Sequence, residues 1–96
     1  MKIAIIGTGN LGKSIAKGLI TTNAITSLYL TKRNLDELSE FEGYKSVHLT
    51  TDNVHAVKQS DIIIFAVQPT HFEAVLQQVK SLLTEHHVLI STITGY

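Results

Sequence analysis

The chain has 96 residues, of which 44% are apolar, and its eight basic and eight acidic residues give a formal net charge of zero. This length suits one compact domain spanning residues 1–96, and the charge balance leaves no overall field to attract nucleic acid or an anionic membrane. The lack of cysteine excludes disulfides and thiolate zinc sites, and the longest apolar run, Ile62–Val67, is too short to cross a bilayer, so we expect a soluble, cytoplasmic protein.

The N-terminal segment predicts a strand, a tight turn and a helix. Lys2–Ile6 is a short apolar run that stops at a glycine cluster. Beyond the cluster, Leu11, Ile15 and Leu19 fall on one face of a helix.

Gly7, Gly9 and Gly12 spell the pattern G-x-G-x-x-G at this turn. Between a strand and a helix, the first glycine permits the sharp turn, the second lets the backbone approach a pyrophosphate, and the third allows close packing of helix on strand. Amides at the helix start then face the anion, which the helix dipole favours. The sequence therefore predicts a dinucleotide site, the alternative being a glycine-rich turn that holds no ligand.

A basic pair follows the second predicted strand, Ser27–Thr31. In dinucleotide-binding folds this strand end usually carries an acid that binds the ribose hydroxyls of NAD, but no acid occurs between the glycine turn and this point. Lys32 and Arg33 suit the 2′-phosphate of NADP, because a guanidinium grips a phosphate through two parallel hydrogen bonds. Thr31 and Asn34 offer further donors. The sequence thus favours NADP (NADPH) as the cofactor over NAD.

Two other interpretations of this charged segment stay open. Asp36 and Glu37 could be the ribose acids, displaced by a longer loop, although their position suits the first turn of the next helix, where negative charge complements the dipole. Lys32 and Arg33 could instead be a solvated pair on a loop.

The remaining segments predict alternating helices and strands. Leu35–Phe41 is weakly helical, Lys45–Leu49 predicts a third strand, and Val88–Thr92 predicts a last one. Asp61–Val67 is apolar without alternation, as in a parallel strand that helices bury on both faces. We therefore expect an α/β fold, a doubly wound, Rossmann-like parallel sheet of about five strands in the order 3-2-1-4-5.

A further helix is predicted between the last two strands. Thr70 and Glu73 have the spacing of a capping box. Apolar residues follow at helical spacing, namely Phe72, Val75, Leu76, Val79, Leu82 and Leu83.

The histidines give no metal-binding pattern. The chain has five, but none forms an i, i+4 pair on a predicted helix, so no metal site is predicted. His71 follows the fourth strand, where it could donate a proton or contact a substrate. The pattern does not identify it as catalytic, and the catalytic residues stay unknown from the sequence.

Several of these segments together resemble the N-terminal cofactor domain of pyrroline-5-carboxylate reductase. The resemblance covers essentially the whole chain and lies in IAIIGTGNLGKSIAKGLI, the basic group after the second strand, Asn53, and SDIIIFAVQPTHFEAVL. Its most specific parts are Asn10 in the glycine turn and Ala-Val-Gln-Pro at 66–69, which is similar to the family's Ala-Val-Lys-Pro. The chain departs from the family at Gln68 and in its ending, STITGY, where the family has a stretch closer to Ser-Ile-Ala-Ala-Gly.

The resemblance implies an enzyme that reduces the cyclic imine pyrroline-5-carboxylate to L-proline, in proline biosynthesis, with a hydride from NADPH or NADH. By resemblance, the glycine turn holds the pyrophosphate, the basic segment the adenosine ribose and its phosphate, Asn53 the adenosine side, and the Ala-Val-Gln-Pro segment the nicotinamide end. The expected cofactor-binding residues are Gly7, Thr8, Gly9, Asn10, Leu11, Gly12, Thr31, Lys32, Arg33, Asn53, Ala66, Val67, Gln68 and Pro69.

The family also implies protein beyond these residues. Its members are homo-oligomers, and a helical dimerisation domain supplies most of the imine pocket. We expect the 96 residues alone to bind NADPH but to lack activity.

Other classes of protein begin with a similar domain. The cofactor domain of a deazaflavin-dependent NADP reductase or of a β-hydroxyacid dehydrogenase is one alternative, and a non-catalytic NADP-sensing module is another. A self-contained module should cover the edge of its sheet, whereas the cofactor domain of a larger enzyme should expose apolar surface where further protein packs.

Overall fold

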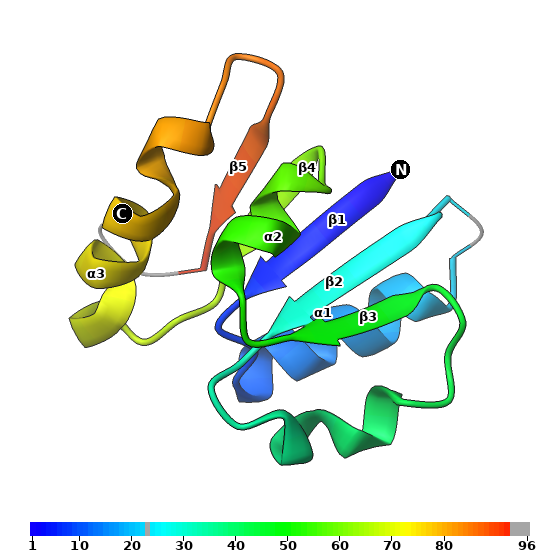
Figure 1. The fold of residues 1–96 in the computed structure, drawn as a ribbon. Helices are drawn as coiled ribbons and strands as arrows, with labels where there is room; N and C mark the ends of the chain where they lie inside the picture. The colour runs from blue at the N-terminus through cyan, green and yellow to red at the C-terminus, as the bar shows by residue number, and fades with distance from the viewer. Residues whose placement is uncertain (23, 93–96) are drawn as a thin grey trace.

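A computed structural model describes residues 1–22 and 24–92, in which a five-stranded parallel sheet lies between two layers of helices (Figure 1). The order of the strands is β3-β2-β1-β4-β5. The strands are β1 (Lys2–Ile6), β2 (Ser27–Thr31), β3 (Val47–Thr50), β4 (Ile62–Phe65) and β5 (Val88–Ser91). The predicted doubly wound fold and its strand order are confirmed.

Helices cover both faces of this sheet. They are α1 (Asn10–Ile20), the 3-10 helix η1 (Leu35–Phe41), α2 (Asn53–Lys58), α3 (Pro69–Val79) and the 3-10 helix η2 (Lys80–Leu82). In Figure 1, α1 and η1 lie on one face and α2 and α3 on the other. A buried cluster fills each interface, one containing Ala16 and Phe41 and the other Phe72 and Val79.

The packing of β4 explains why its sequence is apolar without alternation. Ile63 packs in the cluster beneath α2 and α3, and Ile64 packs in the cluster beneath α1 and η1. Both faces of the strand are therefore covered, as predicted. The strand ends at Phe65, two residues earlier than predicted, and the chain then passes beneath the glycine turn, where Val67 lies against Gly7.

One helix was not predicted, and another begins earlier than expected. The pattern did not predict α2, because its six residues complete fewer than two turns and show no apolar repeat. The side chain of Asp52 caps it by accepting a hydrogen bond from the amide of His55 at 3.1 Å. The predicted capping box is wrong: α3 begins at Pro69, whose fixed φ suits the first helical position, so Thr70 already lies inside the helix.

The apolar face of α1 also differs from the prediction. Gly12 and Ala16 are the buried residues of this helix, and Ile15 and Leu19 pack beside them. Leu11 is 56% exposed, because the close contact of Gly12 with the sheet turns it away. Leu11 therefore belongs to the surface around the glycine turn.

β5 is an edge strand that pairs with β4, and the side chains of β5 remain exposed. Val88, Leu89 and Ile90 are 54%, 49% and 45% exposed. Because successive side chains of a strand point to opposite faces, apolar surface is open on both sides of β5.

Candidate functional site

The glycine turn joins β1 to α1, and its three glycines occupy different environments. Gly7 has a φ of +73°, and a Cβ there would overlap with Cγ1 of Val67 and lie 3.0 Å from its Cα. A Cβ on Gly12 would lie 3.2 Å from Ile5 Cγ2 and 3.3 Å from Ala66 Cβ, which confirms close packing of helix on strand. A Cβ on Gly9 would meet no atom of the described residues within 4 Å, so this backbone is open to a ligand.

Three hydrogen bonds fasten the turn to the end of β2. The amide of Gly7 donates to Thr31 Oγ1 at 3.0 Å, and the amide of Thr8 donates to the Thr31 carbonyl at 2.8 Å. The ammonium of Lys32 donates to the carbonyl of Thr8 at 3.2 Å. Thr8 and Thr31 are 0% and 1% exposed, and the bonds from Gly7 and Lys32 are partly buried.

The start of α1 presents unpaired donors. Gly9 is the N-cap residue, and no side chain among the described residues caps the helix. The amides of Asn10, Leu11 and Gly12 have no acceptor within the described part of the chain, as is usual for the first helical turn. Together with the helix dipole, they favour a bound anion at this point.

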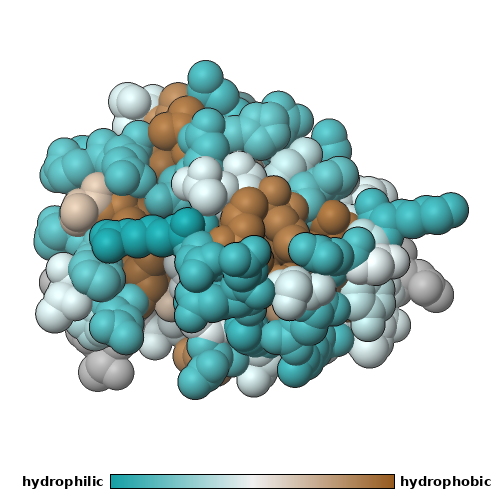
Figure 2. Space-filling model, turned by 60° about the horizontal axis from the view of Figure 1, so that its bottom comes forward, coloured by the Kyte–Doolittle hydropathy of each residue, from teal (hydrophilic) through white to brown (hydrophobic). Residues whose placement is uncertain are grey.

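A cavity of about 340 Å³ opens beside the glycine turn, where the strands end. This volume lies within the roughly 300–1,000 Å³ of typical small-molecule sites. Its lining residues are Gly7, Gly9, Thr31, Lys32, Arg33, Asn34, Glu37, Thr51, Asn53, Ala66, Val67, Gln68, His71 and Val75. Figure 2 brings this side of the molecule forward and shows hydrophobic residues exposed between hydrophilic ones.

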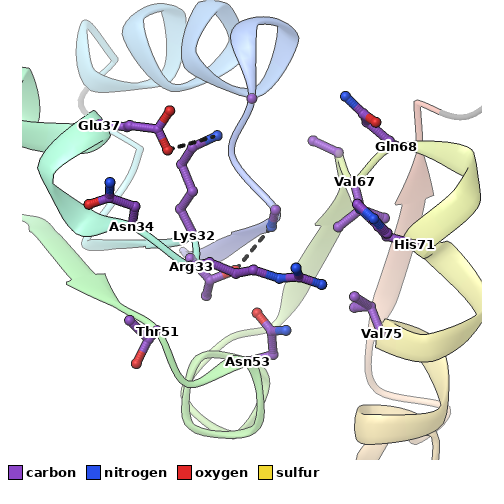
Figure 3. Close-up of a pocket in the computed structure, with 14 residues that line it drawn as sticks. Lys32, Arg33, Asn34, Glu37, Thr51, Asn53, Val67, Gln68, His71 and Val75 are labelled. Atoms are coloured by element: carbon purple, nitrogen blue, oxygen red, sulfur yellow. Dashed lines mark hydrogen bonds and ion pairs between the residues drawn. The ribbon is translucent and has the colours of Figure 1, made fainter.

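The two basic residues at the end of β2 point in different directions (Figure 3). Lys32 turns toward Glu37, with 4.0 Å between the ammonium and the carboxylate, and is 25% exposed. Arg33 extends toward α3 and has no ion-pair partner among residues 1–22 and 24–92. Arg33 therefore presents a free guanidinium to the cavity.

The opposite wall comes from β4 and the helices beyond it. Ala66, Val67 and Gln68 form the connection from β4, and His71 and Val75 line the cavity from α3. Asn53, at the start of α2, donates a hydrogen bond to Gln78 Oε1 of α3 at 2.9 Å. This bond ties α2 to α3 at the rim of the cavity.

The structure brings most of the predicted site residues to one place. Nine line the cavity, namely Gly7, Gly9, Thr31, Lys32, Arg33, Asn53, Ala66, Val67 and Gln68. The other five lie beside it: Thr8 is buried under the turn, Asn10, Leu11 and Gly12 form the first turn of α1, and Pro69 begins α3. In the ending STITGY, positions 93–96 lie outside the described residues.

Five lining residues lie outside the predicted set of cofactor-binding residues, namely Asn34, Glu37, Thr51, His71 and Val75. Of these, Asn34 was named from the sequence as a further donor, Glu37 as an alternative ribose acid and His71 as a candidate substrate contact. Thr51 and Val75 were not named as site residues, although two sequence signals could have identified them. Thr51 directly follows β3, at the edge where parallel strands end. His71 and Val75 are four residues apart, which places both on one face of α3.

The acidic residues of η1 lie in its first turn or bridge it to α1. Asp36 and Glu37 lie in the first turn of η1, as the alternative to a ribose-binding role predicted. Glu40 bridges η1 to α1 through Lys17 at 3.1 Å and Lys13 at 3.2 Å. Hydrogen bonds from Lys17 and then Lys13 hold the pKa of the Glu40 carboxyl below its ordinary value.

The described residues offer neither a metal-binding cluster nor a membrane-spanning helix. Across the described ranges, no group of three or more histidine, cysteine, aspartate or glutamate residues is arranged to hold a metal ion. Within the same ranges, no helix has both the length and the apolar character needed to span a membrane.

Comparison with known proteins gives matches along nearly the whole chain. The family model described as NADP oxidoreductase, coenzyme F420-dependent, matches residues 2–95. Pyrroline-5-carboxylate reductase 1 of Dictyostelium discoideum is 40% identical over 97% of this chain and 17% of its own length. Pyrroline-5-carboxylate reductase 2 of the same organism is 35% identical over 97% of this chain and 32% of its own length.

A solved structure gives the same result. The pyrroline-5-carboxylate reductase of Coxiella burnetii matches with a TM-score of 0.87 and 32% identity, over 98% of this chain and 36% of that one. The resemblance inferred from the sequence is thereby confirmed. The chain spans between 17% and 36% of the length of these three relatives.

Proposed function

The chain belongs to the family of coenzyme F420-dependent NADP oxidoreductases, and from this premise we propose that it is the NADP(H)-binding domain of an enzyme of the pyrroline-5-carboxylate reductase type. The observation that supports this most directly is the arrangement of the cavity. An open glycine backbone lies at one side of it, a free guanidinium at the end of β2, and the Ala66–Gln68 connection at the other side.

The residues present fit a dinucleotide phosphate. The space around Gly9 and the unpaired amides of α1 suit the pyrophosphate, because a negative charge there would satisfy the donors and the helix dipole. Arg33 suits the 2′-phosphate, since its planar guanidinium can donate two parallel hydrogen bonds. Asn53 then lies on the adenosine side, and Ala66–Gln68 with Pro69 border the nicotinamide. NADPH supplies the hydride when bound, while the chain binds and orients it.

Equilibrium titration of the chain with NADPH and NADH tests this proposal. We expect NADPH to bind more tightly, and Arg33→Ala to weaken NADPH binding about tenfold or more, as loss of a charge-assisted pair implies. NADH binding should change less than about twofold, because NADH lacks the phosphate that the guanidinium binds. Failure of the chain to bind either cofactor would contradict the proposal.

Lys45→Ala is a matched control for Arg33→Ala. Lys45 is exposed, lies outside the cavity lining, and loses the same charge on substitution. It should leave both affinities unchanged. A drop in NADPH affinity equal to that of Arg33→Ala would mean that net charge, and not a contact with the 2′-phosphate, sets the preference.

For the complete protein we propose reduction of pyrroline-5-carboxylate. The relatives that match 97% of the chain at 35% and 40% identity are both pyrroline-5-carboxylate reductases. The second candidate is a deazaflavin-dependent NADP reductase, which the description of the matched family model favours. Assays of the complete protein with the cyclic imine and with a reduced deazaflavin would separate the two, since each predicts turnover with one substrate alone.

A cofactor domain of a larger enzyme fits the surface better than a self-contained sensing module does. Val88, Leu89 and Ile90 leave β5 exposed on both faces, where a module should be covered. We infer that further protein packs against β5 and that the complete enzyme is a homo-oligomer in the cytoplasm. Light scattering and cell fractionation of the complete protein test these two statements.

A further inference from the structure

We propose that Lys32 is a positioning residue that holds the glycine turn in its binding conformation, and that Arg33 alone of the basic pair reads the 2′-phosphate. This inference rests on the proposed function and assigns different roles to two residues that the sequence pattern treats alike. The structure separates the two side chains by their contacts. Lys32 points toward Glu37 and Arg33 points across the cavity (Figure 3). The Lys32 ammonium also donates to the Thr8 carbonyl of the turn.

Three hydrogen bonds fasten the end of β2 to the turn. Thr31 accepts hydrogen bonds from the amides of Gly7 and Thr8, and Lys32 donates to the carbonyl of Thr8. All three bonds reach the two residues that directly precede Gly9. The Thr31-Lys32 segment therefore fixes where the open backbone of Gly9 lies, and Lys32 contributes the one side-chain ammonium in this set.

The Lys32 ammonium already has negative or partly negative neighbours. Its ammonium lies 3.2 Å from the Thr8 carbonyl oxygen and 4.0 Å from a Glu37 carboxylate oxygen. Both groups are negative or partly negative, so the ammonium already has two partners with which a phosphate would compete. The side chain is 25% exposed, and moving its ammonium into the cavity would leave the Thr8 carbonyl without this partner.

Arg33 differs from Lys32 in its surroundings. Arg33 is exposed and has no ion pair in the described part of the chain, so it can bind a phosphate without breaking a contact. The two neighbours therefore act at different points of the same ligand. Arg33 acts at the 2′-phosphate, and Lys32 acts through Thr8 at the pyrophosphate, which NADPH and NADH share.

The test compares Lys32→Met, which keeps most of the aliphatic stem but removes the ammonium, with Arg33→Ala and the control Lys45→Met. We expect Lys32→Met to weaken the binding of NADPH and of NADH by the same factor, about five- to tenfold. The dissociation constant of NADH divided by that of NADPH should therefore stay unchanged. Arg33→Ala should lower this ratio toward one. A lower ratio in Lys32→Met, or unchanged affinity for both cofactors, would overturn the proposal.

A second measurement needs no cofactor and so separates this inference from the proposed function. Amide hydrogen exchange in the ligand-free chain should become several-fold faster at Gly7 and Thr8 in Lys32→Met, because their turn loses one of its fastenings. Exchange at Ile63, in the core of β4, should not change. Uniformly faster exchange would indicate general destabilisation. Unchanged exchange at Gly7 and Thr8 would show that Lys32 does not hold the turn. Either result contradicts the positioning role of Lys32.

Discussion

The glycine turn gives the sharpest prediction, because Gly7 and Gly9 are two residues apart and should respond to alanine in opposite ways. At Gly7 an alanine must adopt a φ of +73°, which costs about 1–2 kcal/mol for a residue with a Cβ. Its Cβ would also overlap with the Val67 side chain, and overpacking of this kind adds about 1–3 kcal/mol. We therefore expect Gly7→Ala to lower the free energy of unfolding by about 2–5 kcal/mol.

At Gly9 the same substitution should barely affect stability. The new Cβ meets no atom of the described residues within 4 Å, and φ is −87°, which any residue adopts. Alanine is a slightly poorer N-cap residue than glycine, but it also reduces the conformational freedom of the unfolded chain. These two effects on stability oppose each other, so the free energy of unfolding should change by less than about 1 kcal/mol. Binding should suffer instead, by about tenfold or more for both NADPH and NADH, because the methyl group occupies the approach of the pyrophosphate.

Urea unfolding followed by circular dichroism measures the first effect, and cofactor titration measures the second. A Val67→Ala background adds a direct check of the steric term. Val67→Ala takes away the overlap with Cγ1 but leaves the backbone strain and the 3.0 Å approaches to Cα and Cβ of residue 67. The double variant should still be more stable than the sum of its single changes predicts. Equal stability losses at Gly7 and Gly9, or strict additivity with Val67→Ala, would refute this reasoning.

Two further predictions concern the contacts around the site. The pKa of Glu40 is lowered in the folded chain, so its pairing with Lys17 and Lys13 stabilises the fold above the ordinary pKa of 4.5, and this contribution is lost as the pH falls through the lowered value. Glu40→Gln should thus lower the melting temperature slightly at about pH 7 and not at about pH 2, and a constant difference at both would argue against the ion pair. Asn53→Ala and Gln78→Ala remove the same hydrogen bond and should each cost about 0.5–1 kcal/mol or less. Of these two residues, Asn53 lines the cavity and Gln78 does not. Asn53→Ala should therefore weaken NADPH binding a few-fold, and Gln78→Ala should leave it unchanged. Equal effects of the two substitutions on binding would mean that Asn53 acts through α3.

The glycine turn was predictable because its requirements are local. A positive φ at Gly7 and a close helix contact at Gly12 exclude most side chains, so the need is visible in the residue type itself. The apolar run of β4 was equally direct, because burial on both faces leaves no polar position. α2 was not predictable in this way, since a short helix capped by Asp52 carries no repeat that a pattern could detect.

The basic pair shows where sequence reasoning stops. Its position after β2 correctly placed both residues at the cavity, because that position depends on the strand order alone. The direction of each side chain depends on what lies opposite, and for Lys32 that is a carbonyl more than twenty residues earlier in the chain. A glycine turn that leaves its Thr8 carbonyl facing β2 needs a donor there, and Lys32 meets that need before any ligand binds. Two residues that look interchangeable in the sequence therefore have different surroundings, since Lys32 contacts the Thr8 carbonyl and Arg33 extends into the cavity.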